Sequence, residues 1–427
     1  MRESGVIPLY LSVIVVGAWM IHAFAVSDHK CRTTAVWIKS FRYTSLDKRD
    51  LRIDFLRGIA LVMMVVAHIE VISFFNILTW ERFGLTTGAE GFVILSGFML
   101  GVINRQRLKK EAWLTISYSL YRRAVKIYVT NLLIILTILL ITKISFIKTF
   151  EVTHFTDRFS KVSYTLYPIY DQIKESWFNM VLYLQIGPHQ SQILGLYFYL
   201  LLVTPLFLYL LKRRWVSILL FLSLALYITY HVTGVRITSA EFEFAFPLLA
   251  WQLIYVFGMT MGWYKEELLS LARTQAGYWG LSVIVLFTLL MMFIAQNHTN
   301  PFMPYETMLH VISAHNFNWL YDNFAAKNAL GPLRVINDFS LLITCYLMLT
   351  YFWTPINKLF GWFLITLGQH SLYVFIIHVY VVLLVNQMVN FSLWHRAWLL
   401  NTLVHLSALM ILWLLAKYDV GRRFIPN

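Results

Sequence analysis

The chain has 427 residues, of which 59% are hydrophobic and only 13% are charged. A soluble domain carries roughly 25% charged residues, so this composition excludes a soluble enzyme and indicates a multi-pass membrane protein. The net charge of +14 does not indicate nucleic-acid binding, because the Lys and Arg residues cluster beside apolar segments, as they do at the cytoplasmic ends of membrane spans. We therefore expect an all-α protein, a polytopic bundle of about ten or eleven transmembrane helices in a lipid bilayer.

Long apolar runs recur along the chain from the N-terminus onward. They lie near residues 7–26, 55–76, 84–104, 126–147, 192–211, 215–233, 246–264, 277–296, 338–356, 370–389 and 397–416. We expect residues 1–52 to form an extra N-terminal span with a basic cytoplasmic loop, ahead of a main transmembrane domain over residues 53–427. The run Ala23, Phe24, Ala25 resembles a signal-peptidase site. Cleavage there would leave a basic stretch outside, against the positive-inside rule, so an uncleaved helix is favoured.

Basic residues follow alternate spans and predict the orientation of the chain. They gather before the second span, after the third, at residues 212–214 and near the C-terminus. The C-terminus is therefore expected in the cytoplasm and the N-terminus outside. Two long external loops, residues 148–191 and 297–337, are rich in aromatic, His, Asn and Gln side chains. Such a surface suits a neutral polar ligand such as a sugar, although aromatic residues also gather at membrane boundaries without a ligand.

Two neighbouring spans each carry an ionisable side chain, His68 in one and Glu90 in the next. His68 follows Arg57 by eleven residues, about 16 Å along a helix, which places it near the middle of a hydrocarbon layer about 30 Å thick. Glu90 lies about 22 Å deep when counted back from Arg105. Antiparallel packing would let the carboxylate orient the imidazole, and a neutral imidazole can act as a general base. The alternative is a buried polar contact that only joins two helices.

Several further polar residues stand inside or beside apolar segments. Glu70 lies two residues after His68 and would project from the opposite side of a continuing helix, which favours a structural or acceptor-binding role. Arg122, Arg123 and Lys126 share a helix face with spacing suited to phosphate groups, and Arg57 could join them.

The last third of the chain holds more candidates. His378 aligns with Ser371 two helical turns earlier, and Arg334 and Asp338 have the i, i+4 spacing of a local ion pair or an external ligand contact. Trp251 and Gln252 interrupt an apolar run with polar groups. Neither a zinc signature nor a nucleotide-binding loop appears in the sequence, so we expect no metal and no bound cofactor.

Two segments resemble the membrane acyltransferase superfamily, and more closely its OpgC-type members. They are Asp54-Phe55-Leu56-Arg57-Gly58 followed by His68, and Gly88-Ala89-Glu90-Gly91-Phe92-Val93-Ile94-Leu95-Ser96-Gly97-Phe98. Further matches are Tyr121-Arg122-Arg123, Trp251-Gln252 and the segment 371–378. The resemblance implies that His68 is the catalytic histidine, Arg57 the arginine before it and Glu90 the acidic residue. The wider superfamily usually has a second Arg where Lys126 stands, and Lys keeps the charge but lacks the forked donor geometry.

The resemblance also implies a reaction. OpgC-type proteins are associated with O-succinylation of periplasmic glucans, so we expect acyl transfer from cytoplasmic acyl-CoA, with succinyl-CoA as co-substrate, to an envelope glucan at the bacterial inner membrane. Arg57, Arg122, Arg123 and Lys126 would bind the donor, and the remaining candidates would support the acceptor or the structure: Glu70, Ser96, Trp251, Gln252, Arg334 and His378.

Several alternatives stay open from the sequence. His68 could act as a general base in direct transfer or carry the acyl group covalently. A transporter or flippase for an envelope glycan would use the same buried groups to bind protons or substrate, and a scaffold for glucan synthesis would not need them. No internal repeat of the kind common in transporters is evident.

Overall fold

The computed structural model describes residues 41–44, 49–79, 81–156, 162–167, 177–297, 311–388 and 397–421. The expected first span and the possible cleavage site lie outside these residues. The described residues are mainly helical. The long helices are α3 (Leu51–His68), α4 (Gly88–Arg107), α5 (Trp113–Ile141), α8 (Gln192–Lys212), α9 (Val216–Thr233), α10 (Leu248–Trp263), α12 (Gln275–Ile294), α14 (Pro332–Tyr351), α17 (Ser371–Met388) and α18 (Trp398–Lys417).

Shorter elements connect the long helices. They are η1 (Phe74–Leu78), α6 (Phe150–Thr153), α7 (Trp177–Leu182), η3 (His189–Ser191), η4 (Glu241–Phe244), α11 (Lys265–Leu271), η5 (Ala295–Asn297), α13 (Ala314–Leu320), η6 (Tyr321–Ala325), α15 (Trp353–Ile356), η7 (Asn357–Gly361) and α16 (Trp362–Gln369). Strands β1 (His154–Thr156) and β2 (Ser163–Thr165) pair antiparallel, with Phe155 opposite Tyr164.

Each predicted span after the first overlaps a long helix. Among the described residues, seven helices are long and apolar enough to cross a membrane: α5, α8 with η3, α9, α12 with η5, α14, α17 and α18. Helix α10 is apolar but shorter, with 16 residues. The protein is thus an all-α multi-pass membrane protein, and the total of about ten or eleven spans stays a prediction.

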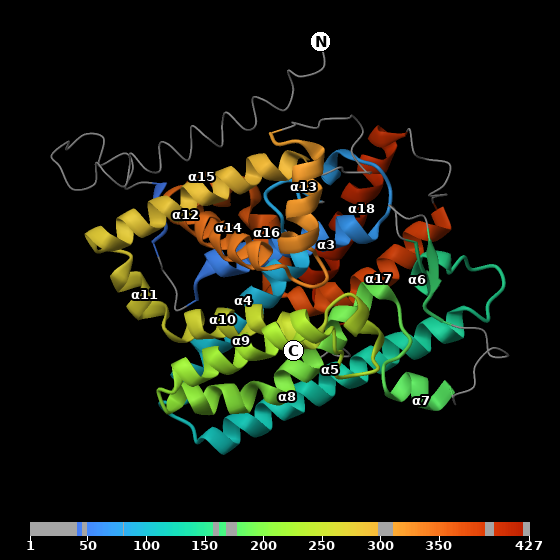
Figure 1. The fold of residues 1–427 in the computed structure, drawn as a ribbon. Helices are drawn as coiled ribbons and strands as arrows, with labels where there is room; N and C mark the ends of the chain where they lie inside the picture. The colour runs from blue at the N-terminus through green and yellow to red at the C-terminus, as the bar shows by residue number, and fades with distance from the viewer. Residues whose placement is uncertain are drawn as a thin grey trace, which may run out of the picture.

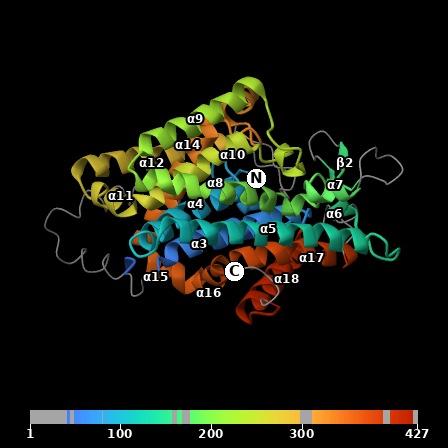
Figure 2. The same cartoon turned by 90° about the horizontal axis from the view of Figure 1, so that it is seen from below.

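Helices α3 and α4 occupy the centre of the bundle in both views (Figures 1 and 2). Helix α3 packs against α4, α14, α16 and α17, and the closest pairing in the bundle is between α4 and α10. That pairing depends on glycines, because a Cβ on Gly97 would overlap the carbonyl oxygen of Tyr255, and a Cβ on Gly258 would overlap that of Ile94. Small residues let membrane helices approach to backbone contact, so these glycines set the position of the helix that carries Glu90.

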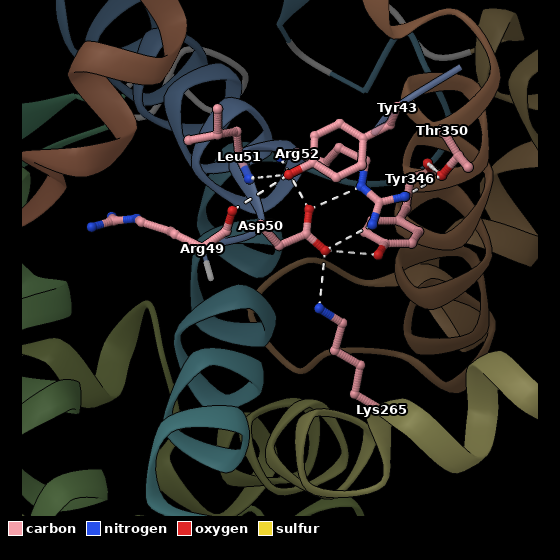
Figure 3. A network of polar contacts seen from close by, with 8 residues as sticks. All are labelled: Tyr43, Arg49, Asp50, Leu51, Arg52, Lys265, Tyr346 and Thr350. Carbon is pink, nitrogen blue, oxygen red and sulfur yellow. Dashed lines mark hydrogen bonds and ion pairs between the residues drawn. The ribbon is translucent and has the colours of Figure 1, made fainter. Parts of the chain in front are cut away.

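The N-terminus of α3 is fixed by a polar network (Figure 3). Asp50 is the N-cap, and its carboxylate accepts hydrogen bonds from the Arg52 guanidinium at 2.9 Å and from the Tyr346 hydroxyl at 2.8 Å. Lys265, at the start of α11, lies 3.0 Å from the same carboxylate. Burial alone would raise the pKa of Asp50, but hydrogen bonds and charge from Arg52 and Lys265 outweigh it and lower the pKa to about 2.

Arg52 is held from two further directions. Its guanidinium donates to the Thr350 hydroxyl at 2.7 Å and lies over the rings of Tyr43 and Tyr346, 4.2 and 4.1 Å from their centroids. The network therefore ties the start of α3 to α14 and α11. Arg52 thus stabilises the position of α3 relative to α14.

The C-terminal end of α3 differs from the prediction. The expected span continued to residue 76, but the helix ends at His68 and Ile69 is extended. Side chains of α18 replace the missing helical bonds, because His405 donates to the Ile69 carbonyl at 3.0 Å and Asn401 donates to the Ile72 carbonyl at 2.8 Å. Glu70 therefore follows the helix instead of projecting from its opposite side, and the prediction for its position was wrong.

Candidate functional site

His68, the last residue of α3, lines a cavity of about 180 Å³. The cavity lies where the ends of several elements converge, and its other lining residues include Thr79, Glu81, Thr87, His189, Gln190, Tyr321, Lys327 and Phe375. A histidine at a helix end beside a cavity can receive a substrate group, whereas the same residue within a packed helix face could not.

His378 on α17 is the hydrogen-bonding partner of His68. Its Nε2 lies 2.8 Å from Nδ1 of His68, and the two rings stack with centroids 5.0 Å apart. Nδ1 of His378 contacts the carbonyl oxygen of Phe375. A carbonyl can only accept, so Nδ1 of His378 carries the proton and its Nε2, in the neutral ring, accepts from Nδ1 of His68. This chain of hydrogen bonds leaves Nε2 of His68 unprotonated, with no partner among the residues that the structure describes.

His189 on η3 is a third histidine at the cavity. Its ring meets the ring of His68 edge-on, with centroids 5.7 Å apart. Nδ1 of His189 and Oε1 of the neighbouring Gln190 are buried without a hydrogen-bond partner in the described structure. Buried polar atoms normally have partners, so the wall beside His68 retains hydrogen-bonding capacity. Over the described part of the chain, no set of three His, Cys, Asp or Glu residues is arranged to hold a metal ion.

Glu90 does not orient His68, and the expected hydrogen bond between these two described residues is not formed. Glu90 is the N3 residue of α4, where it closes a capping box by accepting from the Thr87 backbone N–H at 3.1 Å. Its other carboxylate oxygen accepts from Arg334 at 2.9 Å. The Glu90 carboxylate therefore caps the start of its own helix. The depth of Glu90 in the membrane, counted from Arg105, could not predict this role.

Arg334 is the centre of a buried ion cluster in the first turns of α14. Its guanidinium binds Glu81 as well as Glu90, donates to the Ala325 carbonyl at 2.8 Å and lies 3.2 Å from the Tyr321 hydroxyl. The predicted ion pair with Asp338, also described, is not formed, because the guanidinium points toward the α4 end and not along its own helix. Glu81 and Tyr321 also line the cavity, so this cluster forms part of its wall.

Two arginines from different helices, Arg57 on α3 and Arg123 on α5, interact inside the bundle. Arg57 donates to the Ser371 hydroxyl, and the Arg123 guanidinium lies close enough to repel it electrostatically. Asp54 instead accepts hydrogen bonds from two donor nitrogens of Arg49, Nε at 2.6 Å and Nη2 at 2.7 Å. Nε of Arg57 and Nε of Arg123 are both buried without a hydrogen-bond partner among the described residues. Arg57 and Arg123 therefore form a basic pair inside the bundle, and each keeps a buried donor atom unbonded among the described residues.

The predicted basic face is divided between two sides of α5. The helix begins at Trp113, earlier than expected, because neither Gly nor Pro interrupts the sequence up to Ile141. Arg123 faces inward toward Arg57, whereas Arg122 and Lys126 are exposed on the outer surface of the helix. Only one of the three α5 residues thus belongs to the basic pair.

The remaining candidates make interhelical contacts. Ser96 receives a hydrogen bond from the Tyr197 hydroxyl at 3.0 Å. Trp251 donates from its indole nitrogen to the Asn328 carbonyl at 3.0 Å, and Gln252 donates to the Ser223 carbonyl at 2.8 Å. Glu70 is not among the residues lining the cavity.

Sequence reasoning missed His189, Glu81, Tyr321 and Lys327 at the cavity. All four lie in segments between long helices, where periodicity gives no information. For His189, Tyr321 and Lys327 the available signal was their place in or beside the two polar external loops, which were interpreted as either a sugar-binding surface or interfacial packing; Glu81 gave no signal.

The fold and the site define a multi-pass helical membrane protein with a histidine pair beside a cavity and two partly buried arginines, one on α3 and one on α5. The model of the OpgC protein family matches residues 49–422. The chain therefore belongs to the OpgC family, and membership indicates an acyltransferase-like function in glucan modification. The match leaves the expected N-terminal extra span outside it. Comparison with curated proteins and with solved structures gives no significant match.

Proposed function

We propose that this protein is an integral membrane O-acyltransferase that moves a succinyl group from cytoplasmic succinyl-CoA to a hydroxyl of an envelope glucan at the bacterial inner membrane. The observation that carries the proposal is the cavity-lining His68, whose Nε2 is left free to accept a proton by the bond to His378. A base within reach of a space for substrate is what hydroxyl acylation requires.

In the proposed reaction, Nε2 of His68 removes the proton from the acceptor hydroxyl as its oxygen attacks the thioester carbonyl carbon. The C–O bond forms, the C–S bond breaks, and the CoA thiolate takes the proton back from the imidazolium. His378 is a positioning residue, because it holds the tautomer of His68 and accepts a stronger hydrogen bond once that ring is charged. It takes the role that the sequence assigned to Glu90.

The basic pair of Arg57 and Arg123 supports binding of an anionic donor. Arg57 and Arg123 each retain a buried donor atom without a partner, and leaving such donors unbonded costs free energy. Phosphate oxygens of CoA would satisfy them through charge-assisted bonds. Arg57 lies on the same helix as His68, about 16 Å away by helical rise, a separation that an extended pantetheine arm can bridge. Arg122 and Lys126 would act at the outer rim of the donor path.

The cavity supports binding of a polar acceptor. Gln190, His189 and Thr87 line it together with the aromatic rings of Phe246 and Phe375, a combination of amide, hydroxyl and ring groups suited to sugar. The ion cluster of Arg334 with Glu81 and Glu90 would keep this wall rigid. The acceptor would enter from the side opposite the basic residues of α5.

The test uses purified protein in liposomes with succinyl-CoA labelled in the succinyl group and a glucan acceptor. We expect label to enter the glucan as an ester that mild alkali releases, and His68→Ala to abolish the transfer. His231→Ala on α9, an exposed histidine, is the matched control and should retain full activity. Label that crosses the membrane without forming an ester would indicate a transporter, and equal activity of His68→Ala would refute the assigned base.

A further inference from the structure

Lys327 lines the same cavity as His68 and His189. It lies in the turn that joins η6 to α14, and its charge is close enough to act on both histidines. Neither a hydrogen bond nor an ion pair holds its ammonium group among the described residues. No pattern in the sequence indicated a role for this residue.

The turn that carries Lys327 is anchored on both sides. The buried Trp251 donates to the Asn328 carbonyl at 3.0 Å, and the Tyr227 hydroxyl donates to the Leu330 carbonyl at 2.6 Å. The Leu330 N–H closes the turn on the Lys327 carbonyl at 3.1 Å. These bonds fix the backbone of Lys327 at the cavity, so its position there does not depend on an unattached loop.

The charge of Lys327 is not matched by its neighbours on the cavity wall. The one carboxylate among the cavity-lining residues is Glu81, which is ion-paired with Arg334. A cation beside a cavity next to the catalytic base favours an anionic group on the molecule that occupies the cavity. Since the proposed thioester carbonyl lies at His68, the part of the acyl chain beyond that carbonyl extends into the same space.

We propose that Lys327 is a specificity-determining residue that binds the free carboxylate of a short dicarboxylic acyl chain during transfer. This inference rests on the proposed function and explains how the enzyme would select succinyl-CoA as its donor. A cavity of about 180 Å³ has room for such a chain beside His68, since one water needs roughly 10–15 Å³ of the same kind of volume. Lys327 is itself exposed, and an uncharged chain of equal length would offer its ammonium group no anionic partner.

The test compares succinyl-CoA with butyryl-CoA, which has the same chain length and no terminal carboxylate. For Lys327→Ala we expect kcat/KM with succinyl-CoA to fall about 10- to 100-fold, the range for losing a hydrogen bond to a charged group, while the value with butyryl-CoA stays within about twofold. Lys327→Arg should keep the preference for succinyl-CoA. Lys143→Ala, an exposed lysine away from the cavity, is the matched control and should change neither value.

The outcomes separate this inference from the proposed function. If the wild-type protein transfers acyl groups and Lys327→Ala loses activity equally with both donors, or loses none, the assignment of Lys327 is overturned and the enzyme remains. The assignment is also overturned if the loss of activity in Lys327→Ala depends on the charge of the acceptor and not on the charge of the acyl donor. If the wild-type protein acylates the glucan with neither donor, the proposed function fails and this inference fails with it.

Discussion

Replacing His378 should slow acyl transfer without unfolding the protein. In His378→Leu, Nδ1 of His68 loses its acceptor, and with it the bond that holds the free Nε2 toward the cavity. That bond becomes charge-assisted when His68 takes the proton, and a hydrogen bond to a charged group contributes about 1.5–3 kcal/mol. Because each 1.36 kcal/mol changes a rate tenfold, kcat should fall about 10- to 150-fold.

His378→Gln provides the matched comparison. The glutamine side chain can place an amide oxygen near the position of Nε2, so it can accept from Nδ1 of His68 as the native ring does. We expect it to recover most of the lost rate. A substitution that acted only through packing would not be rescued in this way, because Gln and Leu are similar in size.

The assay is single-turnover transfer of labelled acyl groups in liposomes, measured across pH for the wild type and both variants. Thermal unfolding in detergent shows whether each variant remains folded. A folded His378→Leu protein with a rate within about threefold of wild type would show that the bond from His68 to His378 does not support transfer, since this bond is predicted to contribute at least tenfold.

Three further predictions concern stability, each measured by thermal unfolding in detergent. Arg334→Met should lower the stability of the protein by about 3–5 kcal/mol, because it leaves two buried carboxylates unpaired. The control Arg105→Met, in a more exposed pair, should cost at most about 1 kcal/mol. Equal losses of stability in the two variants would contradict this prediction. Gly258→Ala should cost about 1–3 kcal/mol by pushing α10 from α4, and Gly280→Ala, whose added carbon meets open space, should not destabilise. The pKa of Asp50 is lowered to about 2 from an ordinary 3.8, which predicts about 2 kcal/mol of stability that is present above about pH 4 and lost as pH falls toward 2. Asp50→Asn should remove this stability and its pH dependence. If the variant kept the pH profile of the wild type, Asp50 would not be the group responsible.

The sequence by itself determined the class of the protein and the course of most helices. Apolar runs predicted the ends of α17 almost to the residue, because the thickness of the bilayer sets the length of a spanning helix and that length is visible in the local sequence. It also placed Arg57 and His68 on one helix, and the motif around them predicted the family that the match over residues 49–422 confirms.

Only the tertiary structure decided which polar groups meet. His68 bonds to a histidine 310 residues later in the chain, and Glu90 is bonded to Arg334 instead of His68. Helical spacing gives the depth of a side chain but not the rotation of its helix against its neighbours, so it could not separate Arg123, which faces inward, from Arg122. The role of Lys327 could not be predicted from the sequence either, because its place at the cavity depends on a turn that is held by the distant residues Trp251 and Tyr227.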